Sequence, residues 1–214
     1  MTPAPLRYPT QTLHIPLGEQ TFRVSAVRCI DDLLTDTTPP DDIPFWAVLW
    51  HAAVGLSQFL CEHRHLVCGK RVLELGTGLG LCGIVARWLG GKVTVNDYQP
   101  SALEFALWNA AQNGLRDLQP LLADWRRFPK VLPFDLVLGA DILYERRLHP
   151  SLQQVLKQVT GTGSRVLLAD PWREVAWEFL VEMERDGWRV DFVERTVSVL
   201  GTRQEVIVFE LHPP

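Results

Sequence analysis

The chain lacks several features that would place it in a specialised class of protein. No apolar run among its 214 residues reaches the roughly 18 residues of a membrane-spanning helix. Residues 1–9 contain three prolines and no apolar signal core, so we expect a cytoplasmic protein. The four cysteines form no CxxC pair, which predicts reduced thiols rather than a disulfide framework. His63 and His65 have no acidic or thiol partner at helical spacing, so we expect no metal site.

An excess of positive charge is also missing. The 21 Lys and Arg residues stand against 25 Asp and Glu residues, which gives a net charge of −4. A general nucleic-acid binder normally carries a basic domain, so we expect no nucleic-acid partner. We also expect no membrane partner. Apolar residues make up 47% and charged residues 21%, as in ordinary globular proteins. A chain of this length and composition buries a sizeable core without disulfide or metal support.

Two regions follow one another along the chain. In residues 1–45, apolar stretches at 13–15 and 22–24 flank a turn at Leu17–Gln20, which predicts a β-hairpin. Residues 31–44 are acidic and proline-rich and indicate an irregular connection. From residue 46 onward, short apolar runs alternate with helical stripes of about 10–15 residues. We therefore expect an N-terminal extension over residues 1–45 and one domain over residues 46–214.

The second region predicts an α/β fold. Its strands are continuously apolar, as in a parallel sheet covered on both faces, and alternation with helices implies βαβ crossovers. The last two strands are separated by only about ten residues without a helical pattern, so they should be antiparallel. The expected architecture is a Rossmann-like seven-stranded, mostly parallel sheet with an antiparallel last strand, helices on both faces and an N-terminal β-hairpin. Strands are expected at 72–75, 93–95, 118–123, 134–140, 165–169, 188–194 and 205–211.

A glycine-rich segment follows the first strand of this sheet. Ligands of open α/β sheets bind beyond the carboxyl ends of the strands, where glycines allow a sharp turn and close approach. Residues 78–83 match GxGxxG, and Asp97 lies nineteen positions after Gly78, which fits a dinucleotide site. Glu74 argues against that ligand, because a carboxylate facing the pocket repels pyrophosphate and attracts a cation. The sequence therefore favours a cationic ligand.

The segment Glu74-Leu75-Gly76-Thr77-Gly78-Leu79-Gly80 resembles motif I of class I S-adenosylmethionine-dependent methyltransferases, and the resemblance continues over residues 44–211. It implies that S-adenosylmethionine, which carries a sulfonium and an ammonium, binds at this loop. Asp97 matches the acid that accepts the ribose hydroxyls, and Tyr98 beside it could lie against the sugar or adenine. Asp124 matches the acid that meets the adenine amino group, and Trp125 could stack on the ring.

Two further segments are similar to the seven-strand protein-lysine methyltransferases that carry a DxxY motif. These segments are residues 44–50 and 134–144, and Asp141 and Tyr144 occupy the motif. Trp50 matches an aromatic residue that contacts the cofactor in those enzymes. Asn96-Asp97 and residues 170–173 are similar to the branch that methylates the electron-transfer flavoprotein beta subunit. His51-Ala52 departs from that branch, which usually has proline and glycine there.

The resemblance implies in-line transfer of a methyl group to a lysine amine of a protein. Asp141 would position the lysine and Tyr144 would shape the site, with neither required as a base. These two form the expected catalytic pair. The expected cofactor-binding residues are Trp50, Glu74, Gly76, Thr77, Gly78, Gly80, Asp97, Tyr98, Asp124, Trp125 and Ala140.

Other interpretations of the same residues stay open. The same cofactor serves small-molecule N-methyltransferases, and the sheet core does not separate these from protein modifiers. An NAD-dependent oxidoreductase or a non-catalytic cofactor-binding module also fits the glycine loop. Locally, Asp97 and Asp141 could cap a turn or a helix, and Trp46 and Trp50 could form one packed helical face.

Overall fold

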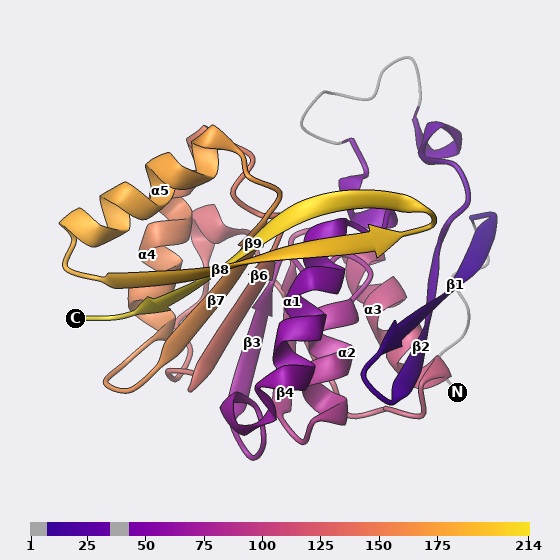
Figure 1. The fold of residues 1–214 in the computed structure, drawn as a ribbon, viewed down its shortest axis with the longest axis horizontal. Coiled ribbons are helices and arrows are strands. Elements are labelled where there is room, and N and C mark those ends of the chain that lie inside the picture. Colours follow the sequence, from indigo (N-terminus) through magenta and orange to yellow (C-terminus); the bar gives the residue numbers. More distant parts are fainter. Residues whose placement is uncertain (1–7, 35–42) are drawn as a thin grey trace.

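The computed structural model describes residues 8–34 and 43–214 and has a seven-stranded sheet at its centre (Figure 1). The strand order is β5-β4-β3-β6-β7-β9-β8. The five strands from β5 to β7 are mutually parallel, whereas β9 is antiparallel to both of its neighbours. This arrangement confirms the predicted fold, including the antiparallel last strand. The strands are β3 Arg71–Leu75, β4 Lys92–Asp97, β5 Gln119–Leu122, β6 Leu136–Ala140, β7 Arg165–Asp170, β8 Arg189–Val199 and β9 Thr202–His212.

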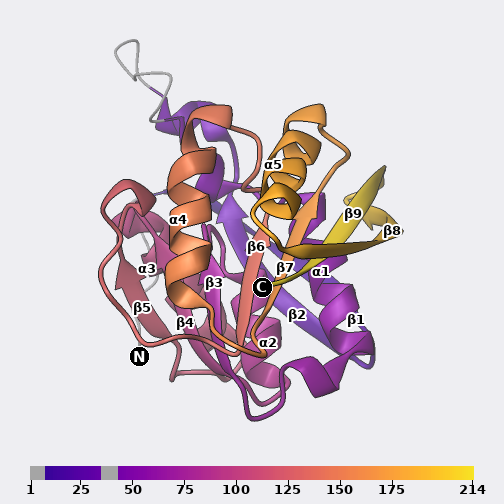
Figure 2. The ribbon, with the colours of Figure 1, turned by 90° about the vertical axis from the view of Figure 1, so that its left-hand side faces the viewer.

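Helices cover both faces of the sheet (Figure 2). Alternate residues of β3 enter different cores: Val72 packs with α1, α2 and α3, while Leu73 and Leu75 pack with α4 and α5. This period of two follows from the pleat of a strand. The helices are α1 His51–Glu62, α2 Leu81–Trp88, α3 Pro100–Gln112, α4 His149–Val159 and α5 Glu174–Arg185. Short 3-10 turns occur at Ile30–Leu33, Phe45–Ala47, Arg64–Leu66, Trp125–Arg127 and Arg146–Leu148. Among the described residues, none of the helices has the length and apolar character needed to span a bilayer.

The strand order indicates where a ligand of this fold would bind. The chain runs outward from β3 through β4 to β5 and then returns to β6 on the other side of β3. The loops after β3 and β6 therefore lead to opposite faces of the sheet. Such a reversal opens a crevice at the carboxyl ends of the strands, where ligands of this class of fold bind.

The predicted N-terminal hairpin is present. Its strands are β1 Thr10–Leu17 and β2 Gln20–Val27, joined by a turn in which Gly18 has a φ of 60°. Leu17, Phe22 and Val24 are fully buried in the same core as α1 and α2. The division of the chain at residue 45 stays a prediction. The expected irregular connection at 31–44 lies largely outside the described residues.

Asn109 of α3 and Asn113, directly after that helix, hold the edge of β2. Asn113 accepts the Arg23 N–H at 3.0 Å and donates to the Arg23 carbonyl at 2.8 Å. Asn109 binds Ser25 in the same way, at 2.8 and 3.1 Å, and also donates to the Leu79 carbonyl at 3.0 Å. Four residues of a helix and two of a strand both span about 6 Å, so the spacings match. The hairpin is thereby joined through α3 to the glycine-rich loop.

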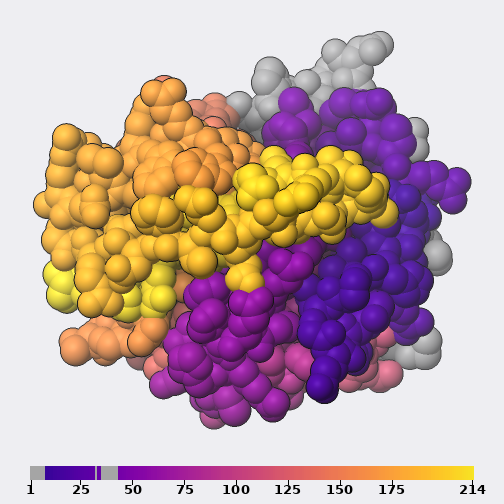
Figure 3. Space-filling model, in the orientation of Figure 1, coloured from indigo at the N-terminus to yellow at the C-terminus, as the bar shows by residue number. Residues whose placement is uncertain are grey.

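The C-terminal hairpin is longer than the sequence predicts. The predicted strands stop at 194 and resume at 205, whereas β8 and β9 continue to a two-residue turn at Leu200 and Gly201. Both turn residues have positive φ, as short hairpin turns require. The added part of β8 buries Val197 and Val199 near α1, and Figure 3 shows the yellow hairpin crossing the purple α1 region. The prediction missed this part because residues 195–204 contain few apolar side chains.

Candidate functional site

The glycine-rich loop between β3 and α2 has a backbone that other residues cannot readily adopt. Gly76, Gly78 and Gly80 have φ values of 61°, 50° and 85°. A Cβ atom at Gly80 would lie 2.7 Å from the Ala106 side chain of α3, closer than real contacts allow. Glycine is therefore required at Gly80 both by conformation and by space.

Three segments distant in sequence touch this loop. A Cβ atom at Gly76 would lie 2.8 Å from Ile142 and 3.5 Å from Trp125, and one at Gly78 would lie 3.3 Å from the Trp46 carbonyl. These neighbours belong to the segments 44–50, 124–125 and 141–144 that the sequence analysis selected. The tertiary structure thus brings all three together around the loop.

Glu74 lies beneath the loop rather than at its surface. Its side chain accepts a hydrogen bond from the Thr77 hydroxyl, and the residue is 3% exposed. Gly83 makes room for the carboxyl, because a Cβ atom there would lie 2.6 Å from Glu74 Oε2. The expectation that this carboxylate faces the pocket is therefore not met, and its role toward a ligand stays a prediction.

Burial makes the charge of Glu74 costly. Desolvation raises its pKa from 4.5 to about 7, and the nearby Asp97 adds to the rise. A carboxyl with a raised folded pKa stabilises most below its unfolded pKa, and this stability is lost as pH rises from 4.5 through 7. Glu74→Gln lacks this titration, so its free energy of unfolding relative to that of the wild type should rise by about 3 kcal/mol from pH 4 to pH 8. Urea unfolding across this range measures the difference, and a constant difference contradicts the burial effect.

Asp97 ends β4 and closes the loop from the side. Its Oδ2 accepts the Gly78 N–H at 3.1 Å and its Oδ1 accepts the Gln99 N–H at 3.0 Å. Burial raises the pKa of the Asp97 carboxyl, while these backbone donors lower it. Asp97 therefore does hold a turn, and each oxygen keeps a lone pair for a ligand hydroxyl. Tyr98, the next residue, is exposed at the same strand end.

Asn96 is a site residue that the sequence analysis quoted without a role. Its amide donates to the carbonyls of Leu121 and Ala123, both at 2.9 Å, and accepts the Trp125 indole N–H at 3.0 Å. It is fully buried. Asn96 therefore fixes the direction of the Trp125 ring beside Gly76. In the sequence, the signal for this role was an asparagine directly after the apolar run at 93–95.

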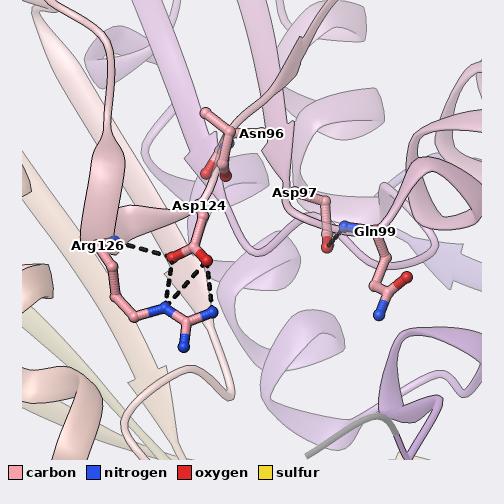
Figure 4. Close-up of polar contacts among 6 residues, drawn as sticks. Asn96, Asp97, Gln99, Asp124 and Arg126 are labelled. Carbon is pink, nitrogen blue, oxygen red and sulfur yellow. Dashed lines mark hydrogen bonds and ion pairs between the residues drawn. The ribbon is translucent and has the colours of Figure 1, made fainter.

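The Asp124 side chain faces Arg126, two residues along the chain. Figure 4 shows its carboxylate facing Arg126, whose backbone N–H donates at 2.9 Å and whose guanidinium lies at 2.5 Å. Arg126 lowers the pKa of Asp124. The carboxylate thus caps the 3-10 turn at Trp125–Arg127, and its contact with an adenine amino group stays a prediction.

An exposed aromatic cluster borders the site. Phe45 lies between Trp50 and Tyr144, with ring centroids 6.2 and 5.9 Å apart. The Trp50 indole N–H donates to the Phe45 carbonyl at 2.9 Å. Trp46 instead packs against Phe105 in the core, so Trp46 and Trp50 do not share a packed face.

The DxxY segment begins directly after β6. Ala140 ends the strand, and Asp141 follows with a left-handed φ of 60° and little exposure. The Asp141 carboxylate is paired with Arg173, at 2.5 Å. Burial raises the pKa of the Tyr144 hydroxyl, and the nearby Tyr98, Asp97 and Asp141 add to the rise. Asp141 and Tyr144 therefore share one environment with the end of β4. No group of three metal-ligating side chains gathers within residues 8–34 and 43–214.

The known proteins to which this chain is similar in sequence are lysine methyltransferases. A family model described as lysine methyltransferase matches residues 45–186. The chain is 41% identical over 130 residues to the protein N-lysine methyltransferase METTL21A of Danio rerio, covering 58% of this chain and 59% of that protein. It is 36% identical over 140 residues to the electron transfer flavoprotein beta subunit lysine methyltransferase of Mus musculus, covering 64% and 54%. The matches span little more than half of these relatives.

Solved structures share the fold at low sequence identity. A TehB-like SAM-dependent methyltransferase from Corynebacterium glutamicum superposes with a TM-score of 0.55 at 20% identity, covering 71% of this chain and 86% of that one. The glycopeptide N-methyltransferase MtfA, complexed with sinefungin, gives a TM-score of 0.59 at 15% identity, covering 77% and 95%.

Proposed function

Because the chain belongs to the lysine methyltransferase family, we propose that it transfers a methyl group from S-adenosylmethionine to a lysine amine of a protein. S-adenosylmethionine is the methyl donor that this family and fold imply, in agreement with the sequence-based expectation. The proposed domain covers residues 46–214, with residues 1–45 as an extension. A cytoplasmic location stays a prediction.

One observation carries the proposal: the DxxY segment lies against the glycine-rich loop. Ile142, inside DxxY, occupies the space where Gly76 lacks a side chain. Asp141 and Tyr144 are therefore held beside the place where a cofactor on this loop would end. A substrate amine that reached Asp141 would meet the cofactor within the same crevice.

The residues present suit the proposed cofactor. The backbone of Gly76, Thr77, Gly78 and Gly80 would line the amino-acid and sugar part, and Asp97 would accept the ribose hydroxyls. Trp125, fixed by Asn96, would offer an aromatic surface to the adenine, and such stacking contributes about 0.5–1.5 kcal/mol beyond burial. Trp50, Tyr98, Asp124 and Ala140 complete the proposed binding set, and Glu74 would support the loop from beneath.

The lysine must lose a proton before it attacks. Its ordinary pKa of about 10.4 lies roughly 3.4 units above pH 7, which costs about 4–5 kcal/mol. Asp141 would hold the ammonium in place, and the neighbouring rings of Tyr144, Phe45 and Trp50 would desolvate it and lower its pKa. S-adenosylmethionine, when bound, supplies a methyl group on a positively charged sulfur. Alignment in near-attack geometry contributes about 7–11 kcal/mol in favourable cases.

Incubation of the purified protein with tritiated S-adenosylmethionine and a cell lysate tests the proposal. We expect label in a protein band, and methyl-lysine after acid hydrolysis of that band. Label in small molecules alone would indicate a small-molecule N-methyltransferase. Tight cofactor binding without any transfer would indicate a binding module.

A side-by-side titration addresses the oxidoreductase alternative. We expect S-adenosylmethionine to bind and NADH to bind more weakly, because the family to which the chain belongs consists of methyltransferases. Tighter binding of NADH would contradict the proposal.

A further inference from the structure

A network of three charged side chains joins the ends of β6 and β7. Arg173 donates its backbone N–H to Asp170 Oδ1 and its Nη1 to Asp170 Oδ2, both at 2.8 Å. The same Nη1 lies 2.5 Å from Asp141 Oδ1. Asp170 is fully buried, and Asp141 is 8% exposed. One guanidinium nitrogen therefore connects a buried carboxylate at the end of β7 to the carboxylate of the DxxY segment.

The backbone on both sides of this network is unusual. Asp141 and Trp172 have φ values of 60° and 64°, and a bulky residue such as tryptophan rarely adopts a left-handed conformation. The turn at Trp172 brings Arg173 back onto Asp170. Strained backbone of this kind persists where the surrounding structure holds it, and it gathers at functional sites. The side chain of Arg173 thus connects the two segments that contain these left-handed residues.

The groups that face Asp141 have opposing effects on its charge. Burial raises the pKa of the Asp141 carboxyl, and Asp170 of β7 raises it further. Arg173 lowers that pKa by direct pairing, and the electrostatic effect of His51 at the start of α1 lowers it by a smaller amount. Tyr144, three residues along, is a further titratable neighbour. Arg173 is thus the contact that favours the carboxylate anion.

We propose that Arg173 is a positioning residue for methyl transfer, which orients Asp141 and keeps it an anion ready to receive the lysine ammonium. The inference rests on the proposed function and extends it to a residue outside DxxY. Two carboxylates and one guanidinium leave a single negative charge in the network. That charge matches one ammonium, so the site would accept a lysine side chain as a monocation and bind a neutral side chain poorly.

The test compares pH profiles of methyl transfer in Arg173→Met, Arg173→Lys and the wild type. Removing the guanidinium raises the pKa of Asp141, so the anion forms only at higher pH. We expect kcat/KM of Arg173→Met to fall by on the order of tenfold or more at pH 7, with the acidic limb moved upward by about 1–3 units. The deficit should shrink toward pH 9. Cofactor affinity should stay within about twofold, because Arg173 pairs with Asp141 and Asp170, neither of which is among the residues proposed to bind the cofactor.

The lysine variant separates charge from geometry. Arg173→Lys restores a cation, so its acidic limb should stay near that of the wild type, while the loss of the rigid, planar guanidinium lowers kcat/KM equally at all pH values. Arg146→Met is the matched control, because Arg146 pairs with Glu178 on the surface and not with Asp141. Its pH profile should match the wild type.

Several results would overturn the inference. A loss in Arg173→Met that is the same at every pH would mean a merely structural role, and unchanged activity would mean none. If Arg173→Met does not fold, Asp170→Asn provides the test: removal of this neighbour lowers the pKa of Asp141, so the acidic limb must move to lower pH. An unmoved limb refutes the inference. Absence of lysine methylation by the wild type would instead refute the proposed function itself.

Discussion

Asp141→Ala should lower methyl transfer to a protein lysine by on the order of a hundredfold or more. The change removes the carboxylate that would hold the lysine ammonium and leaves the charge of Arg173 facing only Asp170. Truncating one partner of a buried charge pair costs about 2–5 kcal/mol, which corresponds to this range of rate. Transfer of tritiated methyl groups at saturating cofactor measures the loss.

Cofactor binding provides the control for this variant. Asp141 is not among the residues expected to bind S-adenosylmethionine, so calorimetry should give an affinity within about twofold of the wild type. Asp141→Asn keeps the size of the side chain and should show nearly the same loss, because the charge is what receives the ammonium. Turnover at the wild-type rate in either variant would remove Asp141 from the substrate site. A parallel loss of cofactor binding would indicate damage to the loop at Gly76 instead.

The second large effect is expected at Asp97. Asp97→Ala should weaken binding of S-adenosylmethionine by about 10- to 100-fold, since hydrogen bonds to a charged group contribute about 1.5–3 kcal/mol each. The change removes the proposed acceptor of the ribose hydroxyls. It also frees the backbone N–H groups of Gly78 and Gln99, which loosens the loop.

Two companion variants sharpen this result. Asp97→Asn keeps one oxygen acceptor, so it should lose less affinity than Asp97→Ala. Asp117→Ala is the control, because Asp117 is an exposed carboxylate that pairs with Arg87 on the surface. Calorimetry on the three proteins should rank them with Asp117→Ala tightest and Asp97→Ala weakest. Equal affinity in all three would restrict Asp97 to the turn that it caps.

Local patterns were sufficient for most of the architecture. The period-two burial of β1 and of the first half of β2, the apolar runs that became β3, β6 and β7, and the glycines after β3 each express a rule that acts over a few residues. The prediction was wrong at the ends of β8 and β9, where pairing continues through residues 195–199 and 202–204. Those residues pair because Val197 and Val199 bury against α1, a contact made across more than a hundred residues of chain.

The candidate site was likewise predicted only in part from the sequence. Gly76, Gly78, Asp97 and Asp141 could be selected from motif and spacing, and the structure brings their segments together at the glycine-rich loop. The direction of Glu74 could not be predicted, because it depends on the space left at Gly83 and on the Thr77 hydroxyl.

The sequence by itself determined the succession of strands and helices along the chain, the position of the glycine-rich loop and the family to which the chain belongs. The reason is that hydrophobic periodicity and short motifs are properties of neighbouring residues. Only the tertiary structure decided which distant side chains bind each other: Asn96 with Trp125 through a hydrogen bond, and Arg173 with Asp141 through an ion pair. Those partners come from the ends of different strands, and their distances are set by how the strands pair and how the loops turn.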